Sequence, residues 1–309
     1  MLLWSSRGEK NYMAKPFVKW AGGKTQLLPV IRKKYPQTVH KYCEPFVGGG
    51  AVLFDVLQEF HPSDVLINDI NPELINVYNQ IKTNINKLLT LLNDFQDDFL
   101  SKKDAERKEF YLTKRTTYNH FLELHNDENG LEKAALFIFL NKTCFNGLYR
   151  VNSKGFFNVP FNNAKNPLIC DVENLIDCSK LLQNVTMHVG DYSSCKSFID
   201  NKTFVYIDPP YRPLTQSSYF TSYNENGFTD KEQIELGTFI TEIAKQGAHI
   251  IASNSDPKNT NKKDNFFDDL YSEFNIERIN ATRMINSNAN KRGAISELLI
   301  SNIASILYT

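Results

Sequence analysis

The sequence predicts an α/β fold that is interrupted by a mostly helical insertion. Short apolar segments alternate with amphipathic helical patterns in both the first and the last third of the chain, which is typical of α/β units. Residues 85–140 instead carry long helical patterns with mixed charge and few β-branched runs. A chain of 309 residues is long enough for one large domain with such an insertion.

The first α/β unit surrounds a run of three glycines. Residues 43–47 resemble the end of a strand that runs into residues 48–50, and an apolar stripe over residues 52–60 then predicts an amphipathic helix. A second strand over residues 65–67 ends at Asn68 and Asp69. The following Asn-Pro-Glu sequence is a helix start, because proline is tolerated in a first helical turn.

The α/β pattern returns after the insertion, with one further helix over residues 230–246. Strands are expected over residues 186–189, 204–207, 249–252, 298–300 and 303–307, and a short helix near the start of the chain over residues 25–35. We therefore assign residues 14–84 and 180–309 to the α/β domain. Residues 85–179 form the insertion, which includes a loop or hairpin over residues 141–161. Residues 1–13 are expected to be an extension without regular structure.

The composition excludes several classes of protein. With 41% hydrophobic residues and 35 residues of each charge, the chain is neither disordered nor collagenous. No apolar run approaches the roughly 20 residues of a membrane span. Residues 2–4 are too short for the apolar core of a secretory signal and Arg7 follows closely, so we do not expect export. Five cysteines without a C-x-x-C spacing indicate neither a disulfide framework nor a zinc site. We expect a cytoplasmic protein without a metal.

The charges are segregated along the chain. Sixteen of the 35 basic residues lie in three stretches without any acidic residue, at residues 10–43, 141–170 and 278–296. If folding brings these stretches together, they form a positive face that suits a polyanion, although single stretches of this kind are commonly solvated loops. Aromatic residues interleaved in the first two stretches favour nucleic acid as the partner.

Two glycine motifs are candidates for ligand binding. Residues 44–50 lie outside the carboxyl end of a strand, and Asp69 follows about 20 residues later, where an acid can bind ribose hydroxyls. Leu53 replaces the third glycine of the dinucleotide pattern, which favours a nucleoside ligand without a pyrophosphate; a plain tight turn is the alternative. Residues 22–25 resemble a phosphate loop, but Val18 replaces its first glycine, so a nucleotide hydrolase is disfavoured.

The sequence Asp208-Pro209-Pro210-Tyr211 directly follows an apolar strand. The two prolines stiffen this turn and place a carboxylate beside a backbone carbonyl, with an aromatic ring beyond them. Such a corner can accept both hydrogens of an exocyclic amine while the ring stacks on the attached base. A merely structural stiff turn is the alternative.

These motifs together resemble the Dam-like DNA adenine-N6 methyltransferases, over nearly the whole chain and in the family's order. The matching segments are residues 19–24, 44–50, 68–71, 190–192 and 208–211. The resemblance implies a Rossmann-like methyltransferase sheet that uses S-adenosylmethionine and no metal, with Asp69 on the ribose. It places in the cofactor pocket Trp20, Gly22, Lys24, Glu44, Phe46, Gly48, Gly50, Asp69, Ile70, Asp191, Tyr192 and Asp208.

The insertion then corresponds to a target-recognition domain. Residues 146–155 and 158–160 resemble the DNA-reading hairpin of members that modify adenine in GATC. Arg150 can bind guanine O6 and N7, and Leu148 can contact a thymine methyl; a phosphate contact and core packing are the respective alternatives. The resemblance puts Lys19 on the outer guanine and Phe145 as a wedge, with further DNA contacts from Asn146, Asn152, Lys154 and Pro160.

The expected reaction is methyl transfer to N6 of an adenine flipped out of double-stranded DNA. Asp208 and the carbonyl of Pro209 would accept the amine hydrogens, and Tyr211 would stack on the base. Two segments, residues 220–223 and residues 292–293 with Glu297, resemble the restriction-modification subgroup of bacteria and phages, so a cognate endonuclease is a further expected partner. A silent DNA-binding protein and a methyltransferase acting on cytosine N4 or RNA are the alternatives.

Overall fold

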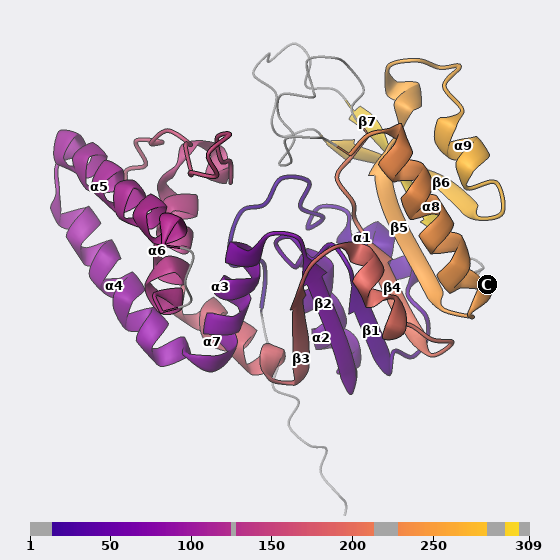
Figure 1. Ribbon diagram of the computed structural model, residues 1–309, viewed down its shortest axis with the longest axis horizontal. Coiled ribbons are helices and arrows are strands. Elements are labelled where there is room, and N and C mark those ends of the chain that lie inside the picture. The colour runs from indigo at the N-terminus through magenta and orange to yellow at the C-terminus, as the bar shows by residue number, and fades with distance from the viewer. Residues whose placement is uncertain (1–13, 125–127, 213–227, 283–293, 303–309) are drawn as a thin grey trace, which may run out of the picture.

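The computed structural model describes residues 14–124, 128–212, 228–282 and 294–302. In this part of the chain the strands form one seven-stranded sheet in the order β3-β2-β1-β4-β5-β7-β6 (Figure 1). Five strands are parallel, and β7 runs antiparallel between β5 and β6. The strands are β1 (Lys41–Glu44), β2 (Asp64–Asp69), β3 (Val185–Val189), β4 (Thr203–Ile207), β5 (His249–Ser255), β6 (Asn275–Thr282) and β7 (Ala294–Ser301).

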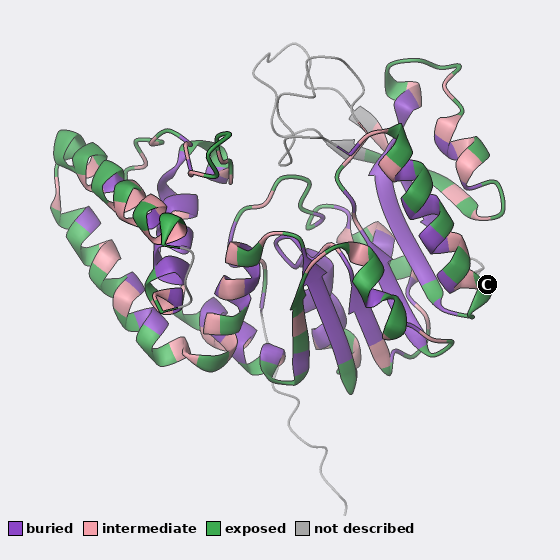
Figure 2. Ribbon diagram, in the orientation of Figure 1, coloured by how far each residue is buried: buried purple, intermediate pink, exposed green. Residues whose placement is uncertain are grey.

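Helices cover both faces of the central strands, so the residues of these strands are buried and mostly apolar. All five residues of β4 are buried, whereas β3 at the edge is largely exposed (Figure 2). Strand β1 pairs with β2 on one side and with β4 on the other, so the order in which the chain adds strands to the sheet changes direction at β1. A ligand site is expected at such a switch of direction, outside the carboxyl ends of the parallel strands.

Two helices of the α/β part, α3 and α8, begin at a residue whose side chain caps the helix. The side chain of Asn71 accepts hydrogen bonds from the backbone amides of Glu73 and Leu74 at the start of α3, and Thr229 and Glu232 form a capping box at α8. The helices of the α/β part are α1 (Leu28–Ile31), α2 (Ala51–Phe60), α3 (Pro72–Thr83), α7 (Val172–Leu181), α8 (Asp230–Lys245) and α9 (Phe266–Leu270).

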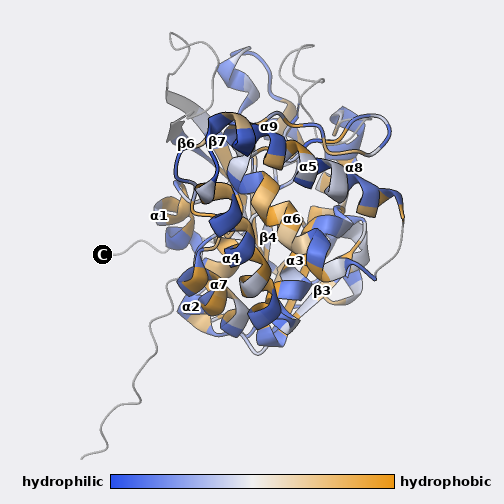
Figure 3. Ribbon diagram, turned by 90° about the vertical axis from the view of Figure 1, so that its left-hand side faces the viewer, coloured by the Kyte–Doolittle hydropathy of each residue, from blue (hydrophilic) through white to orange (hydrophobic). Residues whose placement is uncertain are grey.

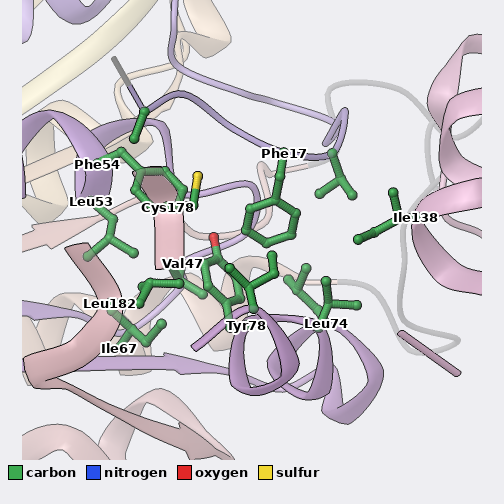
Figure 4. Packing of buried hydrophobic residues seen from close by; sticks show 14 of the residues in the cluster. Phe17, Val47, Leu53, Phe54, Ile67, Leu74, Tyr78, Ile138, Cys178 and Leu182 are labelled. Atoms are coloured by element: carbon green, nitrogen blue, oxygen red, sulfur yellow. The ribbon is translucent and has the colours of Figure 1, made fainter. Parts of the chain in front are cut away.

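The insertion packs on the sheet domain through a shared core. Its helices α4 (Ile85–Ser101), α5 (Asp104–Glu123) and α6 (Gly130–Thr143) lie beyond the β3 edge of the sheet, to the left in Figure 1. Helix α6 is almost entirely buried and apolar, because it packs against α3, α4 and α5 (Figure 3). One hydrophobic cluster runs from the sheet to these helices, and Figure 4 shows Tyr78 within it next to Phe17. Helix α7 crosses the expected boundary at residues 179 and 180 and packs on α2, α3 and α4.

A hairpin over residues 144–161 follows α6. Antiparallel bridges join Cys144 to Phe161 and Val151 to Phe157. Side chains of α5 bind backbone atoms in the second half of this hairpin. Tyr111 Oη donates to Val159 O at 2.8 Å, and the Asn119 side chain forms two hydrogen bonds with the backbone of Phe157, at 2.8 and 3.1 Å. The predicted hairpin is therefore present and is held against the helical insertion.

Several expected elements differ in extent. The expected helix over residues 25–35 is reduced to α1 and a 3-10 helix over Arg32–Lys34, since Pro36 disfavours helical backbone at Tyr35. The first strand ends at Glu44 rather than at residue 47, and strand β6 was not predicted. The expected strand over residues 303–307 lies outside the described residues. In the described ranges, no helix combines the length and apolar composition needed to cross a membrane.

Candidate active site

Acidic side chains gather at the carboxyl edge of the parallel strands. Glu44 ends β1, Asp69 ends β2, Asp208 directly follows β4, and Asp191 comes two residues after β3. Because these four strands are parallel neighbours, the sequence-predicted residues from four distant motifs meet along one edge. The structure thus brings together the positions that the motifs had singled out.

The carboxylate of Asp69 is anchored by backbone amides. Its Oδ2 accepts a hydrogen bond from Gly48 N, and its Oδ1 accepts one from Asn71 N, both at 3.0 Å. Burial raises the pKa of Asp69, while the amide hydrogen bonds lower it. The neighbouring Asn68 donates to Pro45 O and Gly190 O at 3.0 and 2.9 Å, which ties the loops after β1 and β3 together. The acid therefore sits in a fixed position between two loops.

The glycine loop needs its glycines for backbone conformation and for space. Gly48 has a φ of +48°, and a Cβ there would lie 2.7 Å from Trp20 Cδ1. Gly50 has a φ of +73° at the start of α2. Tyr78 Oη donates to Gly48 O at 3.0 Å, so this loop is fixed from the core side as well. A plain tight turn would not require the close approach of Trp20.

Glu44 is buried at the bottom of this edge, with 2% of its surface exposed. Its Oε2 accepts a hydrogen bond from Tyr42 Oη at 2.7 Å. Burial raises the pKa of Glu44 well above its usual range, and the nearby charges of Asp208 and Asp69 raise it further. Glu44 therefore takes up a proton more readily than an ordinary glutamate does.

Apolar side chains flank the acids. The rings of Phe46 and Tyr192 lie 5.4 Å apart, and Ile70 is 60% exposed directly after Asp69. Asp191 is exposed and accepts a hydrogen bond from Ser193 N at 2.9 Å. Acids beside exposed apolar surface suit a ligand with a hydroxylated sugar and a flat ring, such as a nucleoside.

Both oxygens of Asp208 are engaged. Lys24 Nζ lies 2.7 Å from Oδ2, and Ser253 Oγ donates to Oδ1 at 2.8 Å. A carboxylate has about four acceptor positions, so each oxygen retains capacity for a second donor. The strand residue Tyr206 lies behind, with its Oη 3.2 Å from Ser253 Oγ. The sequence predicted Asp208 at this corner but not the serine behind it.

Lys24 lies closer to the Asp-Pro-Pro-Tyr corner than a purely cofactor-binding role would require. Its side chain is 3% exposed, and its Nζ also donates to Gly22 O at 2.5 Å and lies 4.9 Å from the centre of the Tyr211 ring. A buried lysine committed to a carboxylate is not the free phosphate-binding lysine of a nucleotide hydrolase. The phosphate-loop alternative therefore receives no support from the site.

The Asp-Pro-Pro-Tyr corner is also held at its far end. Gln233 Nε2 donates to Pro210 O at 3.1 Å, and Tyr211 Oη donates to Glu297 Oε2 at 2.7 Å. Arg212 forms ion pairs with Asp230 and Asp264 at 2.6 and 2.8 Å. Side chains thus bind both Asp208 and Pro210, the residues before and after Pro209, and so fix the turn around the Pro209 carbonyl.

The hairpin residues expected to contact DNA are largely exposed. Phe145 is 50% exposed, Lys154 and Pro160 are also exposed, and the exposed Arg150 donates from Nε to Asn158 Oδ1 at 2.7 Å. Asn146 has a left-handed backbone with a φ of +57°. Leu148 is half-buried and packs against the hydrophobic core. Core packing, the alternative to a thymine contact, therefore accounts for part of its side-chain surface.

Asn152 has a role within the hairpin turn. Its Oδ1 accepts hydrogen bonds from the amides of Lys154 and Phe156, at 3.0 and 3.1 Å. This Asx-type turn shapes the tip that presents Lys154. The side chain of Asn152, which the resemblance assigns to DNA binding, therefore also stabilises the hairpin turn.

One buried asparagine connects the hairpin to the N-terminal loop. Asn141 Oδ1 accepts a hydrogen bond from Lys19 N, and Asn141 Nδ2 donates to Lys19 O and to Gly147 O, all at 2.9 Å. Gly147 has a φ of +64°, and a Cβ there would lie 2.6 Å from Lys19 Cδ. Lys19 therefore lies beside the part of the hairpin that contains Gly147.

The first two acid-free stretches meet on the surface. Lys19, Lys142 and Lys165 line a groove of about 370 Å³, with Asn162, Asn166 and Leu168 among its other walls. Burial lowers the pKa of Lys142. The third stretch lies mostly outside the described residues, so only two of the three expected parts of a positive face are placed together.

Trp20 links the glycine loop to the hairpin. Its ring stacks with Tyr149 at 6.0 Å and with Phe137 of α6 at 6.4 Å, and its indole contacts the position of Gly48. The aromatic residue expected in the cofactor pocket is therefore also a packing residue between the two parts of the molecule. Among the described residues, no group of three or more His, Cys, Asp or Glu side chains is placed to hold a metal ion.

Several residues of the site carry no motif of their own. Asn141, Ser253, Gln233 and Arg212 were not singled out from the sequence, nor was Asn254, whose Nδ2 donates to Gln233 Oε1 at 3.0 Å. The polar run that ends β5 was the available signal, because polar residues at the carboxyl end of a buried parallel strand point to a site. A comparable signal for Asn141 and Gln233 is absent, since both lie within helical patterns.

The family of the chain follows from its match to a family model. The model of the D12 class N6 adenine-specific DNA methyltransferases matches residues 20–285. The chain therefore belongs to this family and is an adenine-specific DNA methyltransferase, on an α/β fold that is consistent with methyltransferases of this kind.

Individual relatives agree with this assignment. The type II methyltransferase M.MjaIII of Methanocaldococcus jannaschii is 46% identical over 294 residues, covering 93% of this chain and 99% of the relative. The type II methyltransferase M1.LlaDCHI of Lactococcus lactis subsp. cremoris is 37% identical, covering 93% and 95%. The DNA adenine methylase of Escherichia coli K12 is 30% identical, covering 92% and 93%.

Proposed function

We propose that this enzyme transfers a methyl group from S-adenosylmethionine to N6 of an adenine that is flipped out of double-stranded DNA. The observation that carries the proposal is the Asp208–Tyr211 corner, which presents a carboxylate and an aromatic ring at the switch point of the sheet, at the same strand edge as the anchored Asp69 and two strands away from it. The class of reaction comes from the family, and the donor, the base flipping and the target sequence are our proposals.

The residues at the β1, β2 and β3 ends fit the adenosyl group of the donor. The anchored carboxylate of Asp69 is suited to ribose hydroxyls, and Phe46 and Ile70 supply apolar surface for a base. Glycine in the loop at 48–50 lets backbone approach the ligand closely. We assign to this pocket the remaining residues that the resemblance implied, with Lys24 placed between the pocket and Asp208.

The chemistry at Asp208 follows from its acceptors and its charge. When bound, S-adenosylmethionine supplies an electrophilic methyl group on a positively charged sulfur. The carboxylate of Asp208 and the carbonyl of Pro209 accept the two N6 hydrogens, which localises the nitrogen lone pair toward the methyl carbon. The same carboxylate stabilises the positive charge that develops on N6, and Tyr211 stacks on the base. As the N6–methyl bond forms, the bond between sulfur and the methyl group would break and leave a neutral thioether, and N6 would lose one proton to Asp208 or to water.

We propose residues 85–179 as the target-recognition domain and GATC as the target. Its hairpin holds Arg150 for guanine and Leu148 for a thymine methyl. The exposed ring of Phe145 would wedge against bases, and Lys19, fixed by Asn141, would reach the outer guanine. Flipping costs a few kcal/mol, which these contacts and the basic groove would offset.

Transfer of tritium from labelled S-adenosylmethionine to a GATC duplex tests the function. Asp208→Ala is expected to lower the single-turnover rate about 100- to 1000-fold, as loss of a preorganised electrostatic contact does. The matched control is Asp97→Ala, an exposed acid on α4 that should leave the rate unchanged. Wild-type transfer from Asp208→Ala that is folded and binds DNA would refute the assigned role.

The target and the context need separate measurements. DNA from cells that lack adenine methylation but express this protein should resist an endonuclease blocked by methylated GATC. Calorimetry with S-adenosylmethionine separates an enzyme from a silent DNA-binding protein, which would show no binding. Label on cytosine or on RNA would favour the corresponding alternatives. We further propose a cytoplasmic location and a cognate endonuclease that shares the site without a stable complex.

A further inference from the structure

Tyr211 is held by a side chain from a distant strand. Its Oη donates to Glu297 Oε2 at 2.7 Å, although 86 residues separate the two in sequence. Both side chains are half-buried. The proposed function uses only the face of the Tyr211 ring, so this hydrogen bond at the edge of the ring has no role yet.

The ring of Tyr211 needs an anchor of its own. Ser253 and Gln233 fix the carboxylate of Asp208 and the backbone of Pro210, but neither restricts rotation of the tyrosine side chain. The Lys24 ammonium lies over one face of the ring at 4.9 Å from its centre. A hydrogen bond from the hydroxyl is the remaining described contact that sets the plane in which the ring lies.

The anchor is part of the same rigid element that holds Asp208. Glu297 pairs with Ser255 in the antiparallel register of β5 and β7, and Ser253, which binds Asp208, lies two residues earlier in β5. Residues two apart in a strand are on the same face of the sheet. One strand pair therefore fixes both the hydrogen-bond acceptor and the ring.

We propose that Glu297 is a positioning residue that orients the ring of Tyr211 for stacking on the target base. This inference rests on the proposed function, because it assumes that the base lies against Tyr211. The carboxylate acts through the tyrosine hydroxyl and does not contact the substrate. Loss of the hydrogen bond should lower the rate of methyl transfer and leave DNA affinity nearly unchanged, since the hairpin supplies most DNA contacts.

Four variants test this role. Glu297→Ala and Tyr211→Phe each remove the hydrogen bond and should each lower kcat roughly tenfold, with KM for DNA changed less than about twofold. The double variant should be no slower than either single variant, because both delete one interaction. Glu297→Gln retains an acceptor and should restore kcat to within about threefold of the wild type. The control is Ser255→Ala, which removes a neighbouring buried hydroxyl without a partner among the described residues and should leave kcat unchanged.

Three results would overturn the inference: wild-type kcat in Glu297→Ala, full additivity in the double variant, or a Gln variant as slow as the Ala variant. Crystal structures give a readout that does not depend on activity. The Tyr211 ring should rotate away from its wild-type plane in Glu297→Ala, and an unchanged ring would also reject the role. Absence of tritium transfer by the wild type would instead reject the proposed function, so the two failures are distinguishable.

Discussion

Replacing Asn141 with alanine should loosen the junction between the N-terminal loop and the hairpin. This side chain is 3% exposed and makes three hydrogen bonds of 2.9 Å to the backbone of Lys19 and Gly147. The substitution removes all three and leaves one backbone donor and two backbone acceptors without this partner. We expect the fold to persist with a lower free energy of unfolding.

The magnitude follows from the exposure of these groups. An unsatisfied buried polar group costs about 1–3 kcal/mol. Lys19 is exposed, so water can replace its lost partners in part, whereas Gly147 is buried and its carbonyl bears the larger cost. We therefore expect a loss of about 2–4 kcal/mol, which is less than the total stability of most domains.

Urea denaturation of the Ala variant and the wild type measures this difference. The midpoint should fall with an unchanged slope, because the same surface is exposed on unfolding. Asn162→Ala, an exposed asparagine at the end of the hairpin, is the control and should change the unfolding free energy by less than about 0.5 kcal/mol. A change below about 1 kcal/mol in Asn141→Ala would refute the assignment of three net stabilising hydrogen bonds.

Three further outcomes are expected. Gly48→Ala should destabilise the fold by about 1–3 kcal/mol in the same denaturation assay, and more than Gly155→Ala, because both glycines have positive φ but only the Cβ at Gly48 would meet Trp20. A hydrogen bond from Lys41 holds the pKa of Asp200 at about 2, so its stabilisation is complete above its unfolded pKa and is lost as pH falls toward 2. The unfolding free energies of the wild type and Asp200→Asn should therefore converge between about pH 5 and pH 2. All five cysteine thiols are buried, so a thiol reagent should label fewer than one per native chain and five after denaturation.

The sequence predicted those parts of the site that stand at the ends of buried strands. The apolar runs before Asn68-Asp69 and before Asp208 are parallel strands buried on both faces, so the polar residues that follow each run mark the ligand edge. Strand β6 escaped prediction because Ile276 and Ile279 are spaced by three residues, which is not the alternation of a half-buried strand. Its place at the sheet edge follows from pairing with β7 rather than from its own pattern.

The contacts that complete the site depend on distance in the fold. Lys24 and Asp208 are 184 residues apart, and Lys19 and Asn141 are 122 apart. No local periodicity or turn rule connects such pairs. The motif resemblance assigned Lys24 and Asp208 to one pocket, but only the folded structure shows that the Lys24 ammonium reaches Asp208 and the face of Tyr211.

The groups that attach the hairpin to α5 are different from the side chains that the hairpin exposes on its surface. The side chains of Tyr111, Arg115 and Asn119, one helical turn apart, form hydrogen bonds with main-chain atoms of Phe157 and Val159. Because every residue type offers a main-chain carbonyl, and every type except proline a main-chain amide, substitutions at outward positions such as Arg150 leave these attachments intact. Under the target-reading role proposed for the hairpin, a lineage of these enzymes could acquire a different target sequence by exchanging a few surface residues without rebuilding the support beneath them.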